Sequence, residues 1–143
     1  MKRLLLALAL ALLATAVLSA PAAMAKGVKV TLKKSDYGKV LMNARGKALY
    51  LFDKEKGKQS KCYDDCATAW PPFLTKGKPR AGVGVKAKLL GTTRRTNGSR
   101  QVTYKGHPLY FYVHDSPGVI LCQDVFEFGG LWLLVNRRGN AVN

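Results

Sequence analysis

Apolar and polar residues follow two different patterns along this chain. Residues 4–18 form an almost unbroken apolar run directly after Lys2 and Arg3. From residue 28 onward, apolar residues alternate with lysine and threonine, and short apolar stretches are then separated by Gly, Pro and Asn. Alternation with a period of two is typical of half-buried strands, and the separating residues favour turns. The pattern therefore predicts an apolar leader followed by a β-rich domain.

The leader has the three parts of a secretory signal peptide. A positive start and an apolar run are followed by Ala23-Met24-Ala25, a small-residue cleavage site. The apolar run is shorter than the roughly 20 residues needed to span a bilayer, which argues against the alternative of a membrane anchor. We expect a signal peptide over residues 1–25 and a periplasmic or secreted product, residues 26–143, without a transmembrane segment.

Within residues 26–143 the pattern predicts strands, turns and one helix. Asn97-Gly98 is a strong hairpin signal, and Pro71-Pro72 would end a helix because proline cannot donate a backbone hydrogen bond. The expected strands are residues 28–32, 39–42, 48–52, 89–93, 101–104, 109–113 and 131–135; the expected helix is 63–70 and the linker 76–86. In the strand at 48–52, Tyr50 and Phe52 share one face, whereas Leu49 and Leu51 share the other.

Residues sixty positions apart match chemically. The matched pairs are Gly46 with Gly106, Leu49 with Leu109, Tyr50 with Tyr110, Phe52 with Tyr112, Glu55 with Asp115 and Cys62 with Cys122. Self-similarity at a fixed period indicates repeated supersecondary units, each of which needs the other to cover its apolar face. We expect a mainly β fold in which two tandem repeats, about 38–75 and 88–137, form one compact pseudo-symmetric domain with a short helix after Cys62.

The chain is strongly basic. It has 24 Lys and Arg against eight Asp and Glu, a formal net charge of +16, and loss of Lys2 and Arg3 with the leader leaves +14. Such a charge attracts anionic partners. In an envelope these are polysaccharide, lipid head groups or acidic protein. Nucleic acid is not expected, because basic residues are spread over the loops, although Arg94, Arg95 and Arg100 flank one hairpin.

Each repeat carries a tyrosine, an aromatic residue two positions later and an acid five positions later. These six motif residues are Tyr50, Phe52, Glu55, Tyr110, Tyr112 and Asp115. A buried aromatic contributes about 2 kcal/mol or more, and a buried phenol needs a hydrogen-bond partner. We therefore expect structural clasps of Tyr50 with Glu55 and Tyr110 with Asp115. The alternative is a pair of phenol-carboxylate sites for a cation or sugar.

The chain has three cysteines. Cys62 and Cys66 lie one helical turn apart, and in an oxidising compartment we expect them to form a disulfide worth about 2 kcal/mol. Cys122 would then be a buried, inert thiol among apolar neighbours. The alternatives are a bridge between Cys62 and Cys122, or a reactive Cys122 near His114.

Metal or cofactor chemistry has few candidate residues. There is no Cys-x-x-Cys-His haem motif, and we expect no cofactor. A copper or zinc site would have to use His114, Cys122 and a carboxylate, which are ligand types that suit these metals. The chain lacks the common serine-hydrolase, zinc-protease and phosphate-loop motifs. We therefore expect a protein that is not an enzyme.

The repeated motif resembles that of the bacterial secreted-repeat lipoprotein family, named for a tyrosine, any residue, an aromatic, two residues and aspartate. Three further segments carry the resemblance: Cys62-Tyr63-Asp64-Asp65-Cys66-Ala67, Trp70-Pro71-Pro72 and Glu127-Phe128-Gly129-Gly130-Leu131-Trp132. The chain departs from the pattern at Glu55, where aspartate is expected, at Cys122, and in lacking the lipid-accepting cysteine. The resemblance implies an envelope protein without an agreed activity.

Together, these patterns predict an exported, basic repeat protein that is a binding or structural module of the envelope. The alternative function is a redox or metal-handling accessory protein of the envelope, using Cys122 with His114 or a reversible Cys62–Cys66 couple.

Overall fold

The computed structural model describes residues 23–143, so the expected signal peptide lies outside the described residues except for its last three. No helix within 23–143 is long and apolar enough to cross a bilayer. The elements are β1 (Lys29–Ser35), β2 (Gly38–Asn43), β3 (Tyr50–Phe52), α1 (Asp65–Ala69), β4 (Arg80–Ala81), the 3-10 turn η1 (Ala87–Leu89), β5 (Leu90–Arg94), β6 (Arg100–Tyr104), β7 (His107–Pro108), β8 (Val125–Glu127) and β9 (Gly130–Leu134). The mainly β fold with one short helix, as expected, is confirmed.

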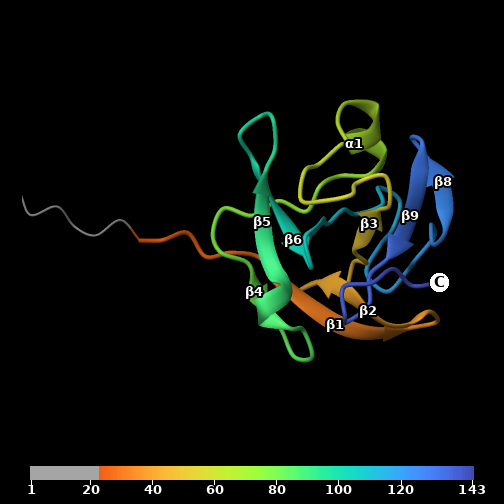
Figure 1. Ribbon diagram of the computed structural model, residues 1–143. Coiled ribbons are helices and arrows are strands. Elements are labelled where there is room, and N and C mark those ends of the chain that lie inside the picture. The colour runs from red at the N-terminus through yellow and green to blue at the C-terminus, as the bar shows by residue number, and fades with distance from the viewer. Residues whose placement is uncertain (1–22) are drawn as a thin grey trace, which may run out of the picture.

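The strands form three small sheets with the orders β2-β1-β4, β3-β9-β8 and β5-β6-β7. Figure 1 shows β1 and β2 along one end of the molecule, β5 and β6 crossing its middle, and β8 and β9 along one side. All pairings are antiparallel except that of β1 with β4, which lies in the expected linker 76–86. Arg80 and Ala81 of the expected linker thus add a third strand to the first sheet.

The two repeats begin with equivalent hairpins. β1 and β2 are joined through Asp36 and Tyr37, and β5 and β6 are joined around Asn97 and Gly98, as the turn signal predicts. Gly98 has a φ of 83°, in the left-handed region that a residue with a Cβ rarely adopts. The start of each repeat is therefore a hairpin set by its turn residues.

β3 lies between two hydrophobic cores. Tyr50 and Phe52 pack into one core with Trp70 and Trp132, while Leu49 and Leu51 belong to the other. All three residues of β3 are buried. The sequence prediction of two apolar faces on this strand is confirmed. Both faces are apolar because each packs into a hydrophobic core.

Helix α1 is shorter than expected. It runs from Asp65 to Ala69, and the backbone N–H of Trp70 closes its last turn by donating to the carbonyl oxygen of Cys66. Pro71 and Pro72 follow at once, which explains the end of the helix.

Two sequence expectations need correction. Residues 109–113 do not form a strand: β7 ends at Pro108, and only isolated bridges from Tyr110 to Tyr50 and Pro72 follow. Strand β8, in contrast, was not expected; it pairs with β9 across a turn in which Phe128 and Gly129 have positive φ. The segment equivalent to β8 in the first repeat is α1, so the repeats diverge after their cysteines.

Candidate functional site

Two tyrosines meet at the centre of the molecule, one from each repeat. The backbone N–H of Tyr50 donates to the carbonyl oxygen of Tyr110 over 2.9 Å, and the N–H of Tyr110 donates to that of Tyr50 over 3.0 Å. This reciprocal antiparallel pair is what a local two-fold relation between the repeats requires. The two motifs thus occupy equivalent places, as the period of sixty predicts.

The clasps cross between the repeats. The hydroxyl of Tyr50 donates to Oδ2 of Asp115 over 2.6 Å, and the hydroxyl of Tyr110 donates to Oε1 of Glu55 over 2.6 Å. The expected pairing of each tyrosine with the acid of its own repeat is therefore wrong. Each acid lies beyond a turn closed by its own N–H, with Glu55 donating to Phe52 and Asp115 to Tyr112. These turns carry the acid away from its own strand and toward the other tyrosine.

Each acid also closes the loop that follows it. Glu55 Oε1 accepts the backbone N–H of Lys61 over 2.7 Å, and Asp115 Oδ1 accepts that of Leu121 over 2.9 Å. Acid and amide are six residues apart in both repeats. The carboxylates therefore hold loops 56–60 and 116–120 in equivalent folds, in addition to clasping the tyrosines.

The two acids are not equally satisfied. Both carboxylate oxygens of Asp115 accept hydrogen bonds, whereas Glu55 Oε2 is buried without a partner. Burial raises the pKa of Glu55 to about 7, although hydrogen bonds from Tyr110 and Lys61 and the positive charge of Arg95 oppose the shift. Burial disfavours the charged form of a carboxyl group. Glu55 is thus a buried acid that titrates near neutral pH.

A second polar cluster adjoins the Glu55 clasp. Arg95 is buried, and its guanidinium donates to Ser60 Oγ, Gln101 Oε1 and the carbonyl oxygen of Cys62. Ser60 Oγ in turn lies 2.6 Å from the Tyr110 hydroxyl. In the sequence Arg95 is one of three basic residues that flank a hairpin. In the structure its side chain is buried and stabilises the interior.

Aromatic rings fill the space beside the tyrosines. The ring of Trp132 is stacked between Phe52 and Trp70, at centroid distances of 4.1 Å on either side. Tyr112, partly buried, lies 4.9 Å from Trp70. Five of the six motif residues, all except Tyr112, are less than 9% exposed. The motif thus builds the interior of the protein.

The disulfide expected between Cys62 and Cys66 is present. Cys122 is free, but the expectation of a buried thiol is wrong: it is only partly buried, and its neighbours Val119 and Leu121 are 44% and 57% exposed. Burial raises the pKa of the Cys122 thiol. His114 is exposed, with its ring 5.5 Å from that of Tyr112. Within residues 23–143, no group of three or more His, Cys, Asp or Glu side chains could hold a metal ion.

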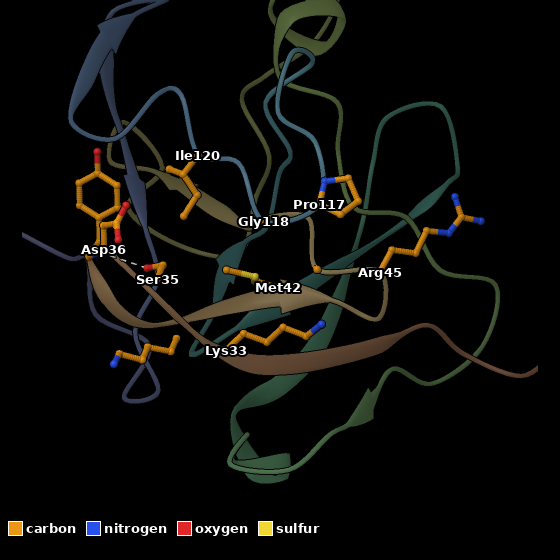
Figure 2. Close-up of a pocket in the computed structure, with 11 residues that line it drawn as sticks. Lys33, Ser35, Asp36, Met42, Arg45, Pro117, Gly118 and Ile120 are labelled. Carbon is orange, nitrogen blue, oxygen red and sulfur yellow. Dashed lines mark hydrogen bonds between the residues drawn. The ribbon is translucent and has the colours of Figure 1, made fainter.

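One surface cavity, of about 520 Å³, lies between the first hairpin and a loop of the second repeat. Figure 2 shows Met42 on its floor, Pro117, Gly118 and Ile120 on the opposite wall, and Asp36 and Arg45 toward its two ends. Lys33 lies along the strand side, and Lys34, Ser35 and Tyr37 complete the lining with Gly46. We call this cavity the first junction pocket.

A further cavity, of about 650 Å³, is the second junction pocket. Its cationic residues are Lys56, Lys58 and Lys105, next to His107, and its apolar residues are Leu51, Leu133 and Ala141. Glu55, Asp53 and Asn140 also contribute, with Gly57 and Gly106. Burial and the charge of Lys105 lower the pKa of His107. Sequence reasoning missed both pockets, because loops from different repeats form them.

A family model described as a secreted repeat of unknown function matches the chain twice, over residues 31–73 and 91–136. The starts of the two matches are sixty residues apart, like the tyrosines and acids of the clasps. No curated protein and no solved structure matches this chain significantly. The two matches cover more than half of the chain, which therefore belongs to the lipoprotein family of secreted repeats of unknown function.

Proposed function

We propose that this protein is a non-catalytic binding module of the cell envelope, which associates through its cationic surface with an anionic envelope component. The family description supports a location outside the cytoplasm. The observation that carries the proposal is how the chain uses its few carboxylates.

Half of the eight acidic side chains accept hydrogen bonds from uncharged donor groups. Asp53 accepts the backbone N–H of Leu131, Glu127 accepts the indole N–H of Trp70, and Glu55 and Asp115 hold the clasps. None of these bonds involves a lysine or arginine side chain. Four of the eight negative charges are thus committed to the fold and do not pair with surface bases.

The basic side chains show the same separation. Within residues 23–143, each hydrogen bond that a lysine or arginine side chain donates goes to a neutral acceptor: Lys54, Arg80, Arg94 and Arg137 to backbone carbonyls, Lys105 to Asn140, and Arg95 to its cluster. The net charge of +14 on residues 26–143 therefore stays largely available to external anions.

The state of Cys122 weighs against the alternative role in which this thiol reacts or binds a metal. Cys62 and Cys66 are joined, and the raised pKa of Cys122 lowers its thiolate fraction at neutral pH. The thiolate is both the nucleophile and the metal ligand. A partly buried thiol with a raised pKa is poorly suited to either task.

The test is binding of residues 26–143 to three anionic probes, each with a neutral counterpart. The probes are polygalacturonate against dextran, phosphatidylglycerol vesicles against phosphatidylcholine vesicles, and polyglutamate against polyglutamine. We expect at least one anionic probe to bind at low salt and to be released as salt rises, because screening weakens exposed charge interactions. Binding to no anionic probe above its counterpart, or binding insensitive to salt, would refute the proposal.

A further inference from the structure

The two junction pockets share one equivalent part, in which a turn of one repeat meets a loop of the other. Arg45 and Gly46 of the first pocket correspond, sixty residues on, to Lys105 and Gly106 of the second. Conversely, Pro117 and Gly118 of the first correspond to Gly57 and Lys58 of the second. Each pocket thus joins a turn of one repeat to a loop of the other, in the same crossed manner as the clasps.

Direct contacts hold these turns against the loops. The N–H of Gly118 donates to the carbonyl oxygen of Gly46 over 3.0 Å, and a Cβ on Gly106 would come within 3.8 Å of Lys58 Cγ. Gly46 and Gly106 have φ of 90° and 83°, a backbone conformation that favours glycine. The paired glycines therefore allow each turn its left-handed backbone conformation beside the opposite loop.

The clasps shape the walls of the pockets. Loop 56–60 lies between Glu55 and the Lys61 amide that Glu55 accepts, and loop 116–120 lies between Asp115 and the Leu121 amide. Lys56 and Lys58 of the first loop, and Pro117 and Ile120 of the second, line the pockets. The buried motif thus positions the loops of two surface sites, and Glu55 itself lines the second.

Both pockets combine cations with apolar surface and hydrogen-bonding groups. The first has Lys33, Lys34 and Arg45 around Met42, Ile120 and Pro117, with the ring of Tyr37 and the polar side chains of Ser35 and Asp36. Lysine and arginine bind carboxylates, an exposed ring offers a flat face to a sugar ring, and polar side chains bind hydroxyls. Volumes of about 520 and 650 Å³ are in the range of small-ligand sites.

We propose that the two junction pockets each bind an acidic sugar unit of an anionic polysaccharide, so that one protein engages two units of the same polymer. This inference rests on the proposed function and names its ligand. Two cationic pockets on one small domain suit a polymer that repeats its charged unit, because linked sites bind more tightly together than singly. A bilayer would present a flat surface, whereas these sites are concave and lined by polar side chains.

Three double variants, each losing two positive charges, test the sites. Lys33→Gln with Arg45→Gln alters the first pocket, and Lys56→Gln with Lys58→Gln alters the second. Lys78→Gln with Lys88→Gln is the matched control, since neither residue lines either pocket. All six side chains are exposed, so the fold should survive. Thermal unfolding of each variant checks this.

The measurement is calorimetric titration with polygalacturonate at fixed salt. We expect each pocket variant to bind about tenfold or more weakly, because loss of one site removes the two-site gain, and the control to bind at most about threefold more weakly through screened charge alone. Galacturonate monomer should compete with the polymer, whereas galactose should not.

The outcomes separate the two proposals. If the wild type binds polygalacturonate but the pocket variants and the control weaken equally, the pocket assignment is overturned while the binding function stands. If it binds phosphatidylglycerol vesicles but not polygalacturonate, the sugar ligand is overturned and a lipid partner replaces it. If no anionic probe binds, both proposals fall.

Discussion

The two clasps at the centre of this protein have the same connections, but they differ in how many carboxylate oxygens accept a hydrogen bond. Asp115 accepts one hydrogen bond on each oxygen, whereas Glu55 accepts two on Oε1 and leaves Oε2 buried and unpartnered. The longer side chain stands where the family motif has aspartate. The difference shows that a repeat can keep the connections of a motif while changing its electrostatics, since burial raises the pKa of Glu55 to about 7.

The largest expected effect comes from removing the complete clasp. Asp115→Ala leaves the buried Tyr50 hydroxyl and the Leu121 N–H without their acceptor, which should destabilise the protein by about 3–5 kcal/mol because each orphaned polar group loses its partner. Glu55→Ala should cost less, about 1–2 kcal/mol at pH 8: it leaves the Lys61 N–H without its acceptor, but Tyr110 still contacts Ser60 and a poorly solvated charge is removed. Urea unfolding measures both.

Asp36→Ala is the control for this pair, because Asp36 is exposed and lies outside both clasps. It should change the free energy of unfolding by less than about 0.5 kcal/mol. Equal losses for the Asp115 and Glu55 variants would show that the two clasps are equivalent after all.

The second effect is a pH dependence at the Glu55 clasp. The pKa of Glu55 rises from an ordinary 4.5 to about 7 on folding, so the folded state binds the proton more tightly than the unfolded state. The resulting stability is complete below pH 4.5 and is lost as pH rises through 7, by about 3 kcal/mol. Glu55→Gln resembles the protonated acid and should lack this loss.

Unfolding curves of the wild type and Glu55→Gln between pH 4 and pH 9 check this prediction. The difference between the two curves isolates Glu55 from the other titrating groups. A difference that stays constant across the range, or that favours the wild type as pH rises, would mean that Glu55 is ionised in the folded protein throughout.

The period of sixty predicted the equivalence of the repeats but could not predict the crossed pairing. A tyrosine and an acid five residues apart look like local partners, and only the turns closed by Glu55 and Asp115 show that the acid leaves its own strand. Long-range pairing of this kind depends on how the two repeats dock. The five-residue spacing between tyrosine and acid is the same whether the pairing is local or crossed, so it does not distinguish the two.

Other features were missed where the repeats differ. Trp70 and Trp132 stack although they are not sixty residues apart, and β8 replaces the helix of the first repeat. The disulfide was predictable from the spacing and the compartment, because both requirements are local. The only sequence signal for the pockets was the match of Gly46 with Gly106. This match predicted the position of a turn in each repeat but not the loop that packs against it.

The third effect contrasts Cys62 with Cys122, which occupy matched positions in the two repeats. Replacing Cys62 and Cys66 together by alanine should cost about 2 kcal/mol, since the disulfide closes only a short loop. Cys122→Ala should cost clearly less, because Cys122 makes no bridge and is only partly buried. Thermal unfolding without reductant compares the two, and similar losses would contradict a stabilising role specific to the bridge.

The smallest effect concerns the chemistry of Cys122 itself. A thiol reagent should modify one cysteine per folded chain and three after unfolding with reductant, because only Cys122 is free. Its rate at pH 7 should be below that of an exposed cysteine and should rise with an apparent pKa above the ordinary value, since burial raises the pKa of this thiol. Cys122→Ser should abolish the labelling. Rapid labelling at pH 6 would instead mean an activated thiolate, and the first repeat's disulfide would then correspond to a reactive site in the second.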